Sequence, residues 1–218
     1  MSPILSSGET FRRRLLQAQT RRGMEMVPTL AYGRHRGPTA PDARFAAVAV
    51  ALYQDLHGQW MIPLTLRPTR LKHHGGQVCL PGGRVERGEQ IREAAVREYE
   101  EEMGLAAEVT ADCGELSTQY VYASNNLVHP VVFMIDRPKK PWQPDPVEVA
   151  EVIPIPLNVL MDPSYRVAVT RSRSVRRDGQ VVGNLSFRTK ALRYGGHDIW
   201  GATALILEEL AQILHPEA

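Results

Sequence analysis

The chain has 218 residues, of which 43% are hydrophobic and 23% are charged, with a formal net charge of +2. This length is enough for one sizeable domain with appendages, and the composition is that of a globular protein rather than a low-complexity chain. The longest apolar run has nine residues (45–53), whereas a membrane-spanning helix needs about 20. Cys79 and Cys113 form no CxxC pair, and the N-terminus has no secretory signal pattern. A reducing cytoplasm is therefore the expected location, and membrane attachment is not expected.

The N-terminal segment is more basic than the rest of the chain. Residues 1–45 contain eight arginines and three acidic residues. We predict a short amphipathic helix at residues 9–21 and an extended connection at residues 27–44. The positive charge has two interpretations, attraction to an anionic ligand or nucleic acid, and a solvated helix face followed by a linker. The second is favoured, so nucleic acid is not the expected partner, and we divide the chain into residues 1–44 and a domain at residues 45–218.

From residue 45 onward, β-compatible runs are interrupted by a few helical ones. Strands are expected at residues 45–52, 60–66, 77–80, 116–122, 128–135, 147–155, 167–175 and 181–187. Helices are expected at residues 89–103 and 202–214, with a helical turn at residues 157–161. Pro81, Gly82 and Gly83 predict a break after the third strand. Because the elements follow no strict βαβ rhythm, we predict an α+β sandwich around a mixed sheet rather than a parallel Rossmann sheet.

The helix expected at residues 89–103 carries an acidic cluster near its C-terminal end. Glu98, Glu101 and Glu102 are spaced i, i+3 and i+4, so their carboxylates share one side of the helix. Like charges repel at this spacing, and a helix C-terminus favours cations, so the cluster is locally unfavourable. A solvated run of glutamates is one explanation. The favoured one is a hard divalent cation, because three carboxylates and the carbonyls of a preceding Gly-Gly turn supply the oxygen ligands that Mg²⁺ prefers.

The same stretch resembles a known family motif. From Gly83 to Leu105 the residues match the Nudix box of Nudix hydrolases, Gx5Ex7REUxEExGU, with one departure. Tyr99 stands where the pattern has an aliphatic residue, on the core side of the helix, so it concerns packing more than chemistry. The resemblance implies an α/β/α sandwich around a mixed sheet, in agreement with the order of elements above.

The resemblance also implies hydrolysis of a nucleoside diphosphate linked to another moiety, with Mg²⁺ or Mn²⁺ as the cofactor. The family's metal ligands correspond to four positions in this chain: Gly82, Glu98, Glu101 and Glu102. Arg97 and Glu89 match the pair that orients the acidic cluster and supports catalysis. A general base is expected as well, either one of these glutamates or a loop carboxylate. Glu148 and Glu151 are both candidates for that loop carboxylate.

Residues 67–83 resemble an additional signature of coenzyme A diphosphatases, roughly LLTxRSxxLRxHxGQxxFPGG. The matching positions are Arg67, Leu71, His74, Gly76 and Gln77. Three positions differ, with Pro68, Lys72 and Leu80 in place of Ser, Arg and Phe. Residues 146–157 and 199–204 resemble the same subfamily. The substrate-binding residues that this resemblance implies are Arg67, Lys72, His74 and Gln77. The alternative is that the basic side chains of this loop are simply solvated.

The leading hypothesis is therefore an enzyme that splits coenzyme A or its derivatives into 3′,5′-ADP and 4′-phosphopantetheine or its acyl form. A Nudix enzyme acting on NADH, ADP-ribose or a nucleoside triphosphate is the first alternative. A catalytically silent Nudix-like binding module is the second. The expected partner is a small-molecule nucleotide, and apolar residues on the N-terminal helix leave a homodimer open.

Overall fold

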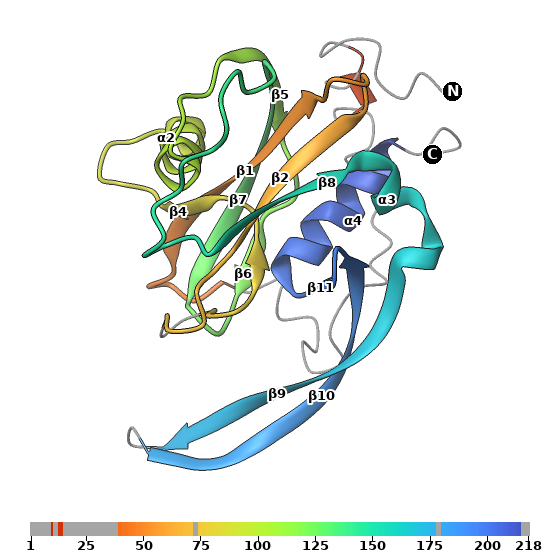
Figure 1. Ribbon diagram of the computed structural model, residues 1–218. Helices are drawn as coiled ribbons and strands as arrows, with labels where there is room; N and C mark the ends of the chain where they lie inside the picture. The colour runs from red at the N-terminus through yellow and green to blue at the C-terminus, as the bar shows by residue number, and fades with distance from the viewer. Residues whose placement is uncertain (1–9, 11–12, 15–38, 72–73, 178–179, 215–218) are drawn as a thin grey trace.

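A mixed eight-stranded sheet forms the centre of the protein, with α2 on one face and α3 and α4 on the other (Figure 1). The computed structural model describes residues 10, 13–14, 39–71, 74–177 and 180–214. The strands are β1 (Arg44–Gln54), β2 (Trp60–Leu66), β3 (Val78–Cys79), β4 (Gly82–Arg84), β5 (Val109–Glu115), β6 (Gln119–Val121), β7 (Asn126–Ile135) and β8 (Glu151–Pro156). The helices are α2 (Ile91–Met103), α3 (Leu157–Met161), the 3-10 helix η3 (Pro163–Tyr165) and α4 (Ala202–Leu214). The predicted α+β sandwich is confirmed, whereas most of the predicted N-terminal helix and linker lies outside the described residues.

Strand β1 lies in the centre of the sheet, and both of its faces are buried. It runs parallel to β7 and antiparallel to β2 and β4. Val50 and Leu52 point into the cluster that α3 and α4 cover, whereas Ala47, Ala49 and Ala51 point toward α2, as expected for alternate residues of a strand. Because alanine side chains are small, α2 packs close to the strands. The acidic side of α2 is thereby brought near the sheet.

Helix α2 has defined signals at both ends. At its start, the backbone N–H of Gln90 donates to the Glu93 carboxylate at 3.1 Å, which is one half of a capping box. At its end, Gly104 adopts φ 62°, the left-handed conformation in which glycine commonly terminates helices. No helix in the described part of the chain is long and apolar enough to cross a bilayer.

Replacing Gly104 with alanine is expected to lower the free energy of unfolding by about 2 kcal/mol, because the added Cβ is strained at positive φ. It would also collide with the carbonyl oxygen of Gln143. Gly88→Ala is the matched control, since Gly88 also has a positive φ (87°) but no atom lies within 4 Å of its added Cβ. Urea unfolding of both variants separates the two effects. Equal losses would show that the contact with Gln143 does not matter.

Several strands differ from their predicted bounds. Gly82 and Gly83 belong to β4, which pairs with β1, where the sequence pattern predicts a break. Strand β5 is not predicted at all, because Cys113 is its single fully buried residue and its apolar pattern is weak. Strand β6 is shorter than the predicted 116–122. Strand β8 starts at Glu151 rather than at residue 147, since the chain before it turns at Asp145.

A long hairpin extends away from the sheet and its helices (Figure 1). It consists of β9 (Arg166–Arg177) and β10 (Gln180–Tyr194), and β11 (His197–Ile199) adds a short third strand at its base. The two strands predicted at residues 167–175 and 181–187 are confirmed, and they pair with each other over longer ranges than predicted. Near the base Ala191 and Leu192 are buried, whereas Val182 and Leu185 farther out are exposed.

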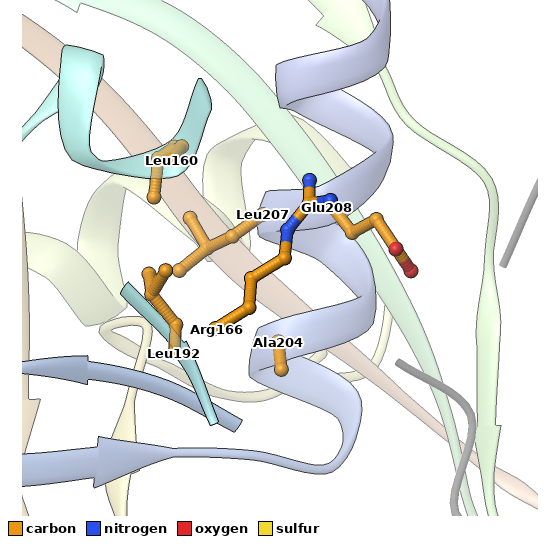
Figure 2. Close-up of a pocket in the computed structure, with 6 residues that line it drawn as sticks. All are labelled: Leu160, Arg166, Leu192, Ala204, Leu207 and Glu208. Carbon is orange, nitrogen blue, oxygen red and sulfur yellow. The ribbon is translucent and has the colours of Figure 1, made fainter. Parts of the chain in front are cut away.

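A small cavity lies where the base of this hairpin meets α3 and α4 (Figure 2). Its volume of about 10 Å³ is room for about one water molecule. The residues that line it are Leu160, Arg166, Leu192, Ala204, Leu207 and Glu208. A nucleotide is far too large for this cavity, which therefore cannot hold such a substrate.

Candidate active site

Helix α2 lies over the point where β1 changes its partner. Near its C-terminal end β1 pairs with β2, and nearer its start it pairs with β4. The acidic side of α2 therefore faces two different strands. The Glu98 carboxylate lies against Gly83 of β4, and the Glu102 carboxylate lies against Thr65 of β2.

Glycine is required at positions 82 and 83 because neighbouring atoms lie too close for a side chain. An unusual backbone conformation is not the reason. Both are strand residues, and neither has a positive φ. A Cβ on Gly83 would collide with the Glu98 carboxylate. A Cβ on Gly82 would lie 2.7 Å from the Cα of Val48 and collide with the carbonyl oxygen of Ala47. The sequence interpretation of these residues as a turn is wrong, and their missing side chains instead make room for the acidic cluster and for β1.

Arg97 holds most of the predicted catalytic glutamates together. Its guanidinium donates to Glu89 at 2.7 and 3.1 Å, to Glu98 at 3.0 Å and to Glu101 at 3.1 Å. A fifth bond, to the carbonyl oxygen of Arg84 at 3.1 Å, ties the group to β4. The hydrogen bond from Arg97 holds the pKa of Glu89 below its usual value. Glu89, Arg97, Glu98 and Glu101 are thus one ion-pair network.

Glu102 lies apart from this network and is buried, with 5% of its surface exposed. The Thr65 hydroxyl donates to one of its oxygens at 3.3 Å, and the Arg67 guanidinium lies 3.4 Å from the other. Burial raises the pKa of Glu102 from 4.5 to about 7, and the negative charges of Glu98 and Glu148 also raise it. Arg67 opposes this shift. The charged form of Glu102 is therefore poorly compensated.

Burial also raises the pKa of Glu98 above its usual value. Arg97 opposes this effect, whereas the charges of Glu101 and Glu148 add to it. Two neighbouring carboxylates with raised pKa values, Glu102 buried and Glu98 partly buried, form a site that favours additional positive charge.

The predicted substrate-binding residues lie on the loop between β2 and β3. Its ends are joined by backbone hydrogen bonds, from Arg67 N–H to the Gln77 carbonyl at 3.0 Å and from Gly76 N–H to the Arg67 carbonyl at 2.9 Å. The fold brings Arg67 to the acidic cluster through its contact with Glu102. The His74 Nδ1 lies 3.1 Å from the Gln77 Oε1, so these two predicted residues are partners of each other. The predicted Lys72 lies outside the described residues.

In the part of the chain that the structure describes, no three His, Cys, Asp or Glu side chains form a group ready to hold a metal ion. The reason lies in the two guanidinium groups. Arg97 draws Glu98 and Glu101 toward itself, while Arg67 and Thr65 hold Glu102. The assignment of Gly82, Glu98, Glu101 and Glu102 as metal ligands stays a prediction.

Thr65 is a site residue that the sequence analysis did not identify. Its side chain is fully buried and bonds to Glu102. The signal was a single hydroxyl residue within the apolar run of β2, because a buried hydroxyl needs a hydrogen-bond partner. Of the two candidate loop bases, Glu148 acts electrostatically on Glu98 and Glu102, whereas Glu151 lies 3.3 Å from His197.

Comparison with known proteins identifies the family of the chain. The NUDIX domain family pattern matches residues 43–175. This is more than half of the chain, and the chain belongs to the Nudix family of hydrolases. Enzymes of this family act on small nucleoside diphosphate derivatives and generally need divalent metal ions such as Mg²⁺ or Mn²⁺.

Two relatives show how far the similarity extends. The chain is 27% identical over 185 residues to Nudix hydrolase 3 of Caenorhabditis elegans, covering 81% of this chain and 76% of that protein. It is 32% identical over 151 residues to the uncharacterized Nudix hydrolase NudL of Photorhabdus laumondii, covering 68% and 74%. Among solved structures, the MutT protein from Methanosarcina mazei Go1 matches with a TM-score of 0.45 and 20% identity, over 56% of this chain and 84% of that one. A MutT/nudix family protein from Enterococcus faecalis matches with a TM-score of 0.46 and 15% identity, over 96% and 72%.

Proposed function

We propose that this Nudix hydrolase splits the diphosphate bond of coenzyme A or its derivatives, giving 3′,5′-ADP and 4′-phosphopantetheine or its acyl form. The observation that supports this substrate is the contact between Arg67 and Glu102. Arg67 belongs to the loop that resembles the coenzyme A diphosphatase signature, and Glu102 belongs to the Nudix box. The two motifs, separate in the sequence, therefore meet in one site. Residues 45–218 are the proposed hydrolase domain, and the cytoplasmic location and the homodimer stay predictions.

The donors present fit a hard divalent cation in kind and in charge. Glu98 and Glu102 are carboxylates whose burial raises their pKa, so both would gain from a cation at close range. Oxygen donors of this type select Mg²⁺ or Mn²⁺. We propose that Glu98, Glu101, Glu102 and the Gly82 carbonyl hold the ion. When bound, such an ion neutralises charge on the diphosphate and promotes attack by water.

Other residues of the chain would orient the metal ligands and accept a proton. Arg97, braced by Glu89, orients Glu98 and Glu101 and limits the number of conformations they can adopt. Glu148 is the proposed general base, because its negative charge acts on both Glu98 and Glu102. It would take the proton of the attacking water.

A second group of residues would bind the substrate. Arg67, Lys72, His74 and Gln77 would contact the phosphate-bearing part of the substrate, for which guanidinium and ammonium donors are suited.

Product analysis tests the substrate proposal. The purified chain is incubated with Mg²⁺ or Mn²⁺ and, separately, coenzyme A, ADP-ribose, NADH and nucleoside triphosphates, and the products are resolved by chromatography. We expect 3′,5′-ADP and 4′-phosphopantetheine from coenzyme A, with slower turnover of the other compounds. Faster turnover of ADP-ribose or NADH would reject the coenzyme A proposal and leave the diphosphatase chemistry intact.

A further inference from the structure

The two guanidinium groups at the acidic cluster are held very differently. Arg97 makes five hydrogen bonds of 2.7 to 3.1 Å, including one to a backbone carbonyl. The Arg67 guanidinium reaches Glu102 through one contact of 3.4 Å, which is longer than the roughly 2.7–2.9 Å of a strong charge-assisted hydrogen bond. Arg97 is thus a fixed part of the site, whereas the end of Arg67 is weakly held.

The backbone of Arg67, in contrast, is well anchored. Its N–H donates to the Gln77 carbonyl and its carbonyl accepts from the Gly76 N–H, which closes the loop between β2 and β3. Its side chain is 28% exposed, so the guanidinium is open to solvent on one side and in contact with Glu102 on the other. Rotation of the side chain alone would move the guanidinium from Glu102 to a ligand beside it.

Glu102 needs a positive partner whenever it is ionised. Its side chain is 6% exposed, and an ionised buried carboxylate without a partner is strongly destabilising. A divalent cation on Glu102 would supply that charge and repel the guanidinium of Arg67. Arg67 and the cation are therefore competitors for the same carboxylate.

We propose that Arg67 is an exchangeable counter-ion that links cation binding to phosphate binding. This inference rests on the proposed divalent cation at Glu102. Without the cation, Arg67 is the positive partner of ionised Glu102 and is not available to the substrate. With the cation in place, Arg67 is released and turns to the diphosphate of a nucleoside diphosphate substrate. The cation and the diphosphate then strengthen each other's binding, and this coupling is reciprocal by thermodynamic necessity.

Direct binding measurements on the full chain test this inference without using activity. Free Mn²⁺ is followed by electron paramagnetic resonance, and the α,β-methylene analogue of ADP, which cannot be hydrolysed at its diphosphate, is followed by calorimetry. In Arg67→Gln we expect Mn²⁺ alone to bind about threefold or more tightly, since its competitor is gone. We expect the gain in analogue affinity caused by Mn²⁺ to fall at least about fivefold, since the released arginine is missing.

Arg70→Gln is the matched control, because Arg70 lies on the same loop but donates to the carbonyl oxygen of Pro146 at 2.6 Å. This variant loses the same charge and should leave both binding constants within about twofold of wild type. If Arg67→Gln does not fold, Arg67→Lys is measured instead. Lysine keeps the positive charge but has a shorter side chain without the guanidinium fork, so both binding constants should shift in the same directions by smaller factors.

Two outcomes would overturn the inference while leaving the proposed function in place. Unchanged or weaker Mn²⁺ binding in Arg67→Gln would mean that Arg67 does not compete with the cation. Equal loss of analogue affinity with and without Mn²⁺ would mean that Arg67 binds phosphate independently of the cation. If wild type bound no Mn²⁺, the metal part of the proposed function would fail together with the inference. Because the analogue represents any nucleoside diphosphate, failure to hydrolyse coenzyme A would not affect this test.

Discussion

Replacing Glu102 with glutamine is expected to lower kcat by at least about 100-fold, because the neutral amide removes one anionic oxygen ligand from the proposed metal site. The shape of the side chain is nearly unchanged, and the Thr65 hydroxyl can still donate to the amide oxygen. Steady-state kinetics at saturating Mg²⁺ measure the effect. The control is Glu108→Gln, which removes a carboxylate whose only described ion pair is with the exposed Lys139. A kcat for Glu102→Gln within about threefold of wild type would contradict the assignment of Glu102 as a ligand.

The same substitution should change how stability depends on pH in the metal-free protein. The pKa of Glu102 is higher in the folded state, about 7, than its ordinary value of 4.5. The folded state therefore binds the proton more tightly, and the wild type loses stability as the pH rises from 4.5 through 7. The loss is on the order of 3 kcal/mol at most. Urea unfolding in the presence of a chelator should show this loss between pH 5 and pH 8 in wild type and a smaller loss in Glu102→Gln. Parallel pH profiles would show that the burial of Glu102 is already compensated.

Alanine at Gly83 is expected to lower kcat, whereas alanine at the neighbouring Gly82 is expected to lower stability. In Gly83→Ala the new methyl group meets the Glu98 carboxylate, a movable side chain, so kcat should fall by about 100-fold with a change in stability below about 1 kcal/mol. In Gly82→Ala the methyl group meets the backbone of Ala47 and Val48, which cannot move without disturbing β1. We expect this variant to lose about 3 kcal/mol of stability.

Kinetics and urea unfolding of both variants provide the comparison, and each variant serves as the control for the other. If Gly83→Ala were as unstable as Gly82→Ala, the Glu98 carboxylate would have to be held too rigidly to move aside. If Gly83→Ala kept its kcat, Glu98 could not be a ligand in the position that it occupies beside β4.

Local signals explain which parts of the fold could be predicted. Helix α4 has the predicted bounds of residues 202–214, and α2 ends at the predicted residue 103, because helical periodicity and a terminating glycine are both local features of the sequence. The hairpins β1–β2 and β9–β10 follow from apolar runs separated by turn residues.

The strands that prediction missed depend on distant parts of the chain. Strand β4 contains two glycines and has little strand propensity, and it exists because β1 offers backbone partners and leaves no room for side chains. Strand β5 has two register shifts against β7 and few buried residues, so its sequence lacks a clear alternation.

In the candidate site, too, local features could be predicted and contacts between distant residues could not. The spacing of Glu98, Glu101 and Glu102 along one helix predicts that they are close in space, and the motif supplies their proposed roles. The contact of Arg67 with Glu102 joins residues that are 35 positions apart. No periodicity in the sequence encodes that separation, because it depends on how α2 packs against β2.

The β9–β10 hairpin has a consequence for how copies of this chain behave in concentrated solution. Among the described residues, β9 pairs with β10 alone, so its outer edge presents unpaired backbone groups that another strand could join. Residues 166–194 contain eight basic side chains and one acidic side chain. Two such hairpins repel each other at low ionic strength, and salt shortens the range of this repulsion to about 8 Å at 0.15 M. The colloidal stability of the protein is thereby tied to the positive charge of one protruding hairpin, although the net charge of the whole chain is only +2.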